Sequence, residues 1–143
     1  MSSKDIEKRA IQSAEAALFR QHYVSAIDVL VGMKLLRPEH VQDWRKGKIP
    51  YLEKVIQVNL HKISHAMKCF RRWAVQKNLK PSETVYQARR VSKRDLQFSK
   101  TNHPLIEKAY RTHYVSPIAL QKKQEKLKTR DALQEHVNPY LLF

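Results

Sequence analysis

The sequence predicts a mainly α-helical domain with a helix-turn-helix-like corner and one small basic β-hairpin. Apolar residues recur at three- and four-residue steps through most of the chain, as on the buried face of a helix. The alternating pattern of a half-buried strand is found near residues 84–100. The length of 143 residues fits one domain. We expect this domain to span residues 1–116, and residues 117–143 to form a projecting C-terminal helix with an apolar tail.

Capping residues predict where the first three helices begin. Ser2 or Ser3 can cap a helix over residues 4–21. Ser25, with Asp28 three residues later, resembles a capping box and opens a second helix that runs to Leu35. Pro38 suits the first turn of a short third helix, which Gly47 ends.

The longest predicted helix covers residues 50–77. Its apolar positions form one stripe: Leu52, Ile56, Leu60, Ile63, Met67, Phe70 and Ala74. An advance of 100° per residue places a largely basic set on the opposite face. The members of that set are Lys54, His61, His65, Lys68 and Arg72. A solvated surface is the plain interpretation of this face, and a phosphate-binding surface is the functional one.

The predicted hairpin pairs residues 84–86 with residues 96–98, and its end is strongly basic. Four cations lie between the two strands: Arg89, Arg90, Lys93 and Arg94. Tyr86 and Phe98 lie alongside them. Cations position phosphates and aromatic rings stack on bases, so this mixture suits RNA or a DNA minor groove. Charged residues also protect exposed strand edges, but four cations within six residues exceed that need.

Two further helices are expected after the hairpin. Pro104 begins a short helix through Tyr110, and Ser116–Pro117 begins a last helix of about twenty residues. That last helix is poorly amphipathic, and the apolar tail Val137–Phe143 follows it. Together they offer a surface for a protein partner.

One short stretch occurs twice. Arg20-Gln21-His22-Tyr23-Val24-Ser25-Ala26-Ile27 returns as Arg111-Thr112-His113-Tyr114-Val115-Ser116-Pro117-Ile118. The two copies are interpreted either as a paired structural element or as coincidence in a connector, because one recurrence does not make a repeat protein.

The charge of the chain points to a polyanionic partner. Lys and Arg number 28 against 13 Asp and Glu, a net charge of +15, and residues 51–100 hold 12 of the basic and 3 of the acidic side chains. Self-repulsion on this scale destabilises a compact fold, so nucleic acid is the first partner to consider. The single Cys69 excludes an intramolecular disulfide. The chain lacks an apolar run of membrane-spanning length and an apolar signal core at its start, which predicts a cytoplasmic protein without a membrane partner.

A helix-turn-helix is predicted at residues 27–46. Five apolar residues can hold its two helices at a fixed angle: Leu30, Val31, Leu36, Val41 and Trp44. The stretch from Trp44 to Pro50 resembles the end of a recognition helix in repressor-like domains, and it carries Arg45, Lys46 and Lys48. Two features oppose a DNA reader. Leu35 holds the turn position that such domains usually give to Gly. Glu39 and Asp43 on the exposed face would repel phosphates. A DNA reader and a plain helical corner both stay open.

Metal binding and catalysis are weaker interpretations. His61, His65 and Cys69 recur every four residues, as three metal ligands along one side of a helix would. Neighbouring cations and the lack of nearby carboxylates favour exposed histidines, so we expect neither a metal nor a cofactor. Scattered carboxylates do not predict a metal-dependent nuclease. His103 and His113 flank Tyr110 and Arg111 but have no orienting partner. We expect a non-catalytic protein, with a nuclease as the enzymatic alternative.

Five strings in the chain resemble a known family. They are Asp43-Trp44-Arg45-Lys46-Gly47, Phe70-Arg71-Arg72-Trp73-Ala74, Lys80-Pro81-Ser82-Glu83-Thr84, Leu96-Gln97-Phe98-Ser99-Lys100 and Tyr110-Arg111-Thr112-His113-Tyr114-Val115-Ser116-Pro117. They resemble the N-terminal region of a family of uncharacterised bacterial proteins, over most of residues 15–120. Members continue into a cysteine-rich ribbon and a C-terminal domain of unknown function, which this sequence lacks. The resemblance implies a bacterial cytoplasmic binding module and no particular activity.

These observations predict a nucleic-acid-binding protein with contacts mainly to phosphates. Structured RNA is favoured over a specific DNA operator, because the helix that would read DNA is partly acidic. The alternatives are a protein-interaction module that uses the C-terminal helix and tail, and a helix-turn-helix DNA-binding regulator.

Overall fold

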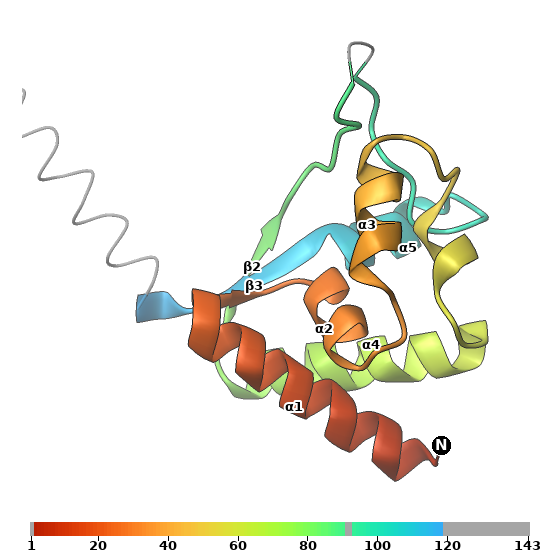
Figure 1. Cartoon of the computed structure of the whole chain (residues 1–143). Helices are drawn as coiled ribbons and strands as arrows, with labels where there is room; N and C mark the ends of the chain where they lie inside the picture. The colour runs from red at the N-terminus through yellow and green to blue at the C-terminus, as the bar shows by residue number, and fades with distance from the viewer. Residues whose placement is uncertain (1, 91–92, 119–143) are drawn as a thin grey trace, which may run out of the picture.

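Helices dominate the fold, and a small antiparallel sheet lies beside them, which confirms the predicted fold class (Figure 1). The computed structural model describes residues 2–90 and 93–118. The described elements are α1 (Ser3–Gln21), β1 (Tyr23–Val24), α2 (Ala26–Gly32), α3 (Pro38–Arg45), the 3-10 helix η1 (Leu52–Val55), α4 (Leu60–Gln76), β2 (Lys80–Glu83), α5 (Pro104–Arg111) and β3 (Thr112–Val115).

Helix α1 packs against α2 and α4 through a face of small residues. Its buried positions are Ile6, Ala10, Ala14 and Ala17, and alanines let helices approach closely. Gly32 at the end of α2 shows how close this approach is, because a Cβ there would lie 2.7 Å from the Ser13 side chain. Helix α2 starts with the expected capping box of Ser25 and Asp28, and the Ser2 cap expected for α1 is part of a second capping box with Asp5.

The two copies of the repeated stretch form neighbouring strands. Strand β1 pairs antiparallel with β3, with Tyr23 opposite Val115 and Val24 opposite Tyr114. Strand β2 pairs with the other side of β3, which gives the order β1-β3-β2. The interpretation as a paired structural element is therefore confirmed. This sheet joins β1 to residues about ninety positions later in the chain. It was not expected from the sequence, because β2 reads Lys80-Pro81-Ser82-Glu83, and Lys, Pro and Glu are uncommon in strands.

The prediction of one continuous helix over residues 50–77 is wrong, because two separate helices occupy this stretch. Residues Leu52–Val55 form η1, and α4 begins only at Leu60. Asn59 caps α4, because its side chain accepts a hydrogen bond from the backbone N–H of Lys62 at 2.9 Å. The backbone N–H of Gln57 donates to the carbonyl of Leu35 at 2.8 Å, a contact outside any helix.

The segment around the predicted hairpin is an irregular antiparallel arm. We call residues 86–90 and 93–96 the arm. Gln87 bridges Asp95, Leu96 N–H donates to the Tyr86 carbonyl at 2.7 Å, and Ala88 N–H donates to the Arg94 carbonyl at 2.8 Å. Regular strands at residues 84–86 and 96–98 are not formed. The arm projects from the body on the side opposite α1 and α4 (Figure 1).

The corner between α2 and α3 forms, and Trp44 anchors it to the later part of the chain. The indole is fully buried against Phe98 and Tyr86, and its Nε1–H donates to the Gln97 carbonyl at 2.8 Å. The left-handed residue of the corner is Lys34 (φ 62°), so the objection drawn from Leu35 does not apply to this turn.

Two glutamates attach α5 to its surroundings. The buried carboxylate of Glu107 accepts hydrogen bonds from the backbone N–H groups of Phe98 (2.7 Å) and Ser99 (2.8 Å) and from the Ser99 hydroxyl (2.7 Å). Glu53 in η1 accepts a bond from the Tyr110 hydroxyl at 2.8 Å. Burial, and then this bond to a carboxylate, raise the pKa of Tyr110.

The predicted C-terminal helix and apolar tail lie almost wholly outside the described residues. At its expected start, the Ser116 hydroxyl accepts a hydrogen bond from the Ile118 backbone N–H at 3.2 Å. Within residues 2–90 and 93–118, no helix combines the length and apolarity needed to cross a bilayer.

Candidate nucleic-acid interface

The fold brings together two basic groups that are forty residues apart in the sequence. The end of α3 and the turn after it lie against the arm, and together they form what we call the α3–arm surface. Its cations are Arg45, Lys46, Lys48, Arg89, Arg90, Lys93 and Arg94. A backbone hydrogen bond joins the two segments: the N–H of Arg89 donates to the carbonyl oxygen of Arg45 at 2.7 Å. The Arg94 guanidinium reaches the Gly47 carbonyl at 3.4 Å.

Gly47 makes this contact between segments possible. It ends α3 in the left-handed conformation, with φ 78°, which glycine adopts without strain. A Cβ at this position would lie 3.3 Å from Cζ of Arg90, so the guanidinium rests directly over the glycine. The glycine expected to stop the third helix therefore also provides the space for an arm cation.

The α3–arm surface is positively charged and poorly neutralised. Among the described residues, none of its cations forms an ion pair with a carboxylate, and all except Arg45 are exposed. Asp95 is the nearby carboxylate on the arm, and it accepts a hydrogen bond from the Gln87 amide. Cations held close together without carboxylate partners attract an external polyanion.

Arg45 differs from the other cations of this surface because it is half-buried. Its guanidinium lies over the Tyr86 ring, 4.9 Å from the centroid. Desolvation by burial, with a smaller contribution from the neighbouring charge of Arg89, lowers the pKa of Arg45. Burial raises the pKa of Tyr86 to about 12. Arg45 therefore supports the base of the arm, while the exposed cations point to solvent.

The aromatic residues expected to stack on bases are not available for that purpose. Tyr86 and Phe98 are 5% and 0% exposed, and their rings meet edge to face with centroids 5.3 Å apart. Both belong to the core beside Trp44. The expectation that they lie on the binding surface was wrong, because on the base of the arm the aromatic side chains point inward and the cations outward.

The basic face predicted on the long helix is dispersed. Lys54 lies on η1, apart from the α4 residues, although it is exposed. His65 is half-buried against the start of α1, where its Nε2 lies 3.1 Å from the Ser3 carbonyl oxygen. His61, Lys68 and Arg72 remain exposed on α4. Helix α4 lies at the other end of the molecule from the arm, so these residues do not join the α3–arm surface (Figure 1).

The remaining site interpretations find local structural roles for their residues. His65 lies 3.8 Å from the Cys69 sulfur, and burial raises the pKa of that thiol. In the part of the chain that the structure describes, no three metal-ligating side chains gather. His103 caps α5 through Nδ1, and Arg111 forms an ion pair with Glu83 at 2.7 Å. His113 hydrogen-bonds the Tyr86 hydroxyl and stacks on Tyr23.

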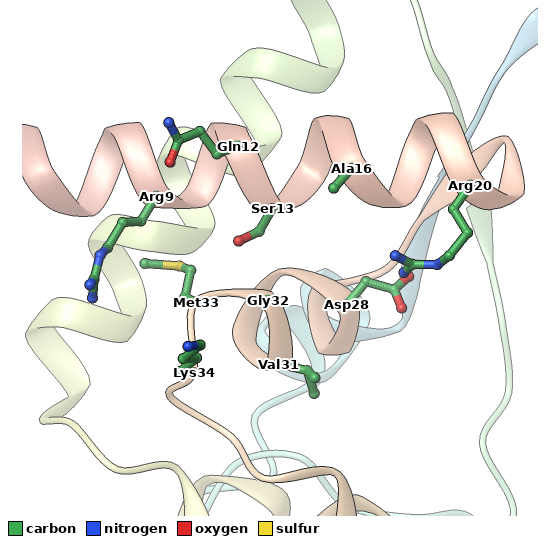
Figure 2. Close-up of a pocket in the computed structure, with 10 residues that line it drawn as sticks. All are labelled: Arg9, Gln12, Ser13, Ala16, Arg20, Asp28, Val31, Gly32, Met33 and Lys34. Atoms are coloured by element: carbon green, nitrogen blue, oxygen red, sulfur yellow. The ribbon is translucent and has the colours of Figure 1, made fainter.

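A second basic site, which the sequence analysis did not identify, is a groove between α1 and α2. It has a volume of about 500 Å³, and Figure 2 shows Arg9 and Arg20 near its two ends with Asp28 beside Arg20. Lys34, which follows the end of α2, lies next to Met33 on the same side of the groove as Arg9 (Figure 2). Arg9 and Arg20 are eleven residues apart, which is three helical turns, so their shared face on α1 could have been found from spacing.

Comparison of the chain with models of protein families, with curated proteins and with solved structures finds no match. The residues and their geometry alone therefore carry the functional argument.

Proposed function

We propose that this protein is a non-catalytic binder of double-helical nucleic acid, with folded RNA favoured over DNA. The observation that supports the proposal is the α3–arm surface, which collects cations from two distant segments without carboxylate partners among the described residues. Phosphate contacts of this kind provide affinity with little sequence preference. We place the protein in the cytoplasm, where such a partner is abundant.

The double helix is favoured over a single strand because the candidate stacking residues are buried. Proteins that bind single strands present exposed aromatic rings on which bases stack. Tyr86 and Phe98 are enclosed in the core instead, which leaves cations as the contacts that the base of the arm offers. Cations alone fit the regular phosphate rows of a duplex.

RNA is favoured over a specific DNA site because of the exposed face of α3. A recognition helix contacts base edges with its N-terminal residues. In α3 that region carries Glu39, which lies 3.9 Å from Arg37 in an exposed ion pair, and Asp43 follows one turn later. Carboxylates on this face oppose insertion into a DNA groove. The helix-turn-helix regulator is therefore the weaker proposal, and interaction through the C-terminal helix and tail concerns residues outside those described.

The test is a comparison of three ligands of equal length under one salt condition. An RNA hairpin stem of about twenty base pairs should bind at least as tightly as the matching DNA duplex, and both should bind more tightly than an unstructured single strand. Fluorescence anisotropy with labelled ligands measures the three affinities. Tightest binding to the single strand would contradict the duplex proposal, and tight binding to one DNA sequence would support the regulator instead.

A further inference from the structure

A second surface, of different character, lies between α4 and α5. It is an apolar groove of about 600 Å³ whose walls include Leu60, Met67, Leu105 and Ile106. Leu60, Leu105 and Ile106 are 60%, 72% and 42% exposed. The predicted apolar stripe therefore serves two surfaces: Ile63 and Phe70 are buried in the core at the floor of the groove, and Leu60 and Met67 continue the stripe along its wall. Apolar side chains gathered in one groove indicate that another segment covers it.

The rim of the groove is basic. Lys68, Arg71 and Lys100 line it, and none of them forms an ion pair with a described carboxylate. Glu53 also lines the groove, but its carboxylate already accepts bonds from the Tyr110 hydroxyl and from the backbone N–H of Lys100 at 3.2 Å. An occupant that complements this groove is apolar and carries acidic groups at its edge.

Residues 131–143 of the same chain have this composition. The segment reads Asp-Ala-Leu-Gln-Glu-His-Val-Asn-Pro-Tyr-Leu-Leu-Phe, with two carboxylates, six large apolar residues and no Lys or Arg. Residues 119–130 before it carry five of the cations. The cations of this end of the chain therefore precede residue 131, and residues 131–143 can approach a groove with a basic rim without bringing Lys or Arg to it.

Strand β3, which leads toward this segment, contacts a residue of the groove. Tyr114 of β3 packs edge-on against Phe70, a groove residue, with ring centroids 5.3 Å apart. Ile118 follows four residues later, and twelve residues separate it from Asp131. Twelve extended residues reach at most about 40 Å, which is on the order of the diameter of a domain of this size, so the segment can return to the groove.

We propose that residues 131–143 bind in the α4–α5 groove of their own chain. Leu133 and the apolar residues from Val137 onward cover Leu60, Met67, Leu105 and Ile106. Asp131 and Glu135 approach Lys68, Arg71 and Lys100. This contact is separate from the α3–arm surface, and its failure would leave the nucleic-acid proposal standing.

Photo-cross-linking of the full chain tests the contact. A benzoylphenylalanine probe at position 105 should form cross-links within the chain to residues 131–143, located by peptide mass spectrometry. A probe at position 60 reports the same contact from the other wall of the groove. The matched control is a probe at position 75, since Val75 is 70% exposed on α4 but does not line the groove.

Charge reversal tests the chemistry of the contact. Lys68→Glu with Arg71→Glu should lower the cross-link yield about fivefold, as expected when two exposed attractions become repulsions. Asp131→Lys with Glu135→Lys should do the same, and all four changes together should restore the yield. Cross-links that join only different chains, or equal yields from positions 105 and 75, would overturn the proposal.

Discussion

Trp44 is the residue whose surroundings most directly link the two halves of the molecule. It extends from α3, yet its ring contacts Tyr86 and Phe98, and its indole N–H bonds the Gln97 carbonyl. Trp44→Ala should lower the free energy of unfolding by roughly 3–5 kcal/mol, because it leaves a large cavity and an unpaired carbonyl. Urea denaturation measures the change. Phe19→Ala is the control, since Phe19 is 89% exposed and its loss should have little effect. An unchanged midpoint for Trp44→Ala would contradict this packing.

His113 makes the stability of the fold depend on pH. Burial, and secondarily the charge of Arg45, lower the pKa of His113 below its ordinary value of 6.5, while Asp28 opposes the shift. Nε2 of His113 hydrogen-bonds the Tyr86 hydroxyl within this buried site, where a charged ring would lose its hydration. The native state therefore disfavours the protonated ring. The stabilising contribution is fully present above pH 6.5 and is lost as the unfolded chain takes up the proton below that value.

Urea denaturation at pH 7.5 and pH 5.5 checks this dependence. The wild-type chain should be less stable at the lower pH. His113→Gln should be less stable than wild type at pH 7.5 and should show a smaller difference between the two conditions. His61→Gln is the control, because His61 is exposed and should leave the difference unchanged. Equal pH dependence in wild type and His113→Gln would show that this ring stays titratable in the native state.

At the scale of elements, the arm is the segment whose charge can be reversed without disturbing the core. Arg89→Glu, Arg90→Glu, Lys93→Glu and Arg94→Glu together should weaken nucleic-acid binding on the order of 100-fold, because repulsion replaces attraction at exposed positions. The control changes the net charge equally: Lys8→Glu, Lys77→Glu, Lys80→Glu and Lys108→Glu, all exposed and away from the arm. Anisotropy titration compares the two variants. Equal losses would mean that net charge, and not the α3–arm surface, determines binding.

A second control separates the arm from α3. Glu39→Gln with Asp43→Asn removes the two carboxylates on the exposed face of that helix. If the arm carries binding, affinity should change little. Clearly tighter binding to DNA, with only a small effect of the arm variant, would support the helix-turn-helix regulator.

The sequence predicts elements where local signals decide and misses those that depend on tertiary contacts. Serine caps and prolines at first-turn positions locate α1, α2, α3 and α5 to within a few residues. The break before α4 was missed because the apolar stripe continues through it, although Asn59 is a good capping residue. The sheet was missed because strands of two to four residues gain their stability from pairing with distant partners.

The same distinction applies to the candidate site. The identities of the cations could be predicted, because exposed Lys and Arg need no tertiary information. Their grouping could not, since the contact between Arg45 and Arg89 joins distant segments. The buried position of Tyr86 also depends on that contact, because Trp44 and Phe98 enclose the ring from other elements.

At the scale of the whole molecule, the net charge of +15 should make binding strongly salt-dependent. If about five phosphates are neutralised, the slope of log K against log salt concentration should be near −4 to −5 for duplex DNA. Anisotropy titrations at salt concentrations from about 50 to about 300 mM measure this slope, because the affinity changes strongly over that range. The arm variant should have a slope several units shallower. A flat response in the wild-type chain would remove the electrostatic basis of the proposed function.

The pairing of β1 with β3 has a consequence for biosynthesis. When the ribosome has made the chain from α1 through β2, one edge of β1 and one edge of β2 still await β3, the strand that lies between them. Glu107, which holds the Phe98 and Ser99 backbone, is also still missing. Contacts between segments so far apart in the sequence form late and slow folding. The nascent chain therefore stays incompletely folded, with exposed strand edges, until residues through Val115 have left the exit tunnel, and chaperones or proteases can act on it during that interval.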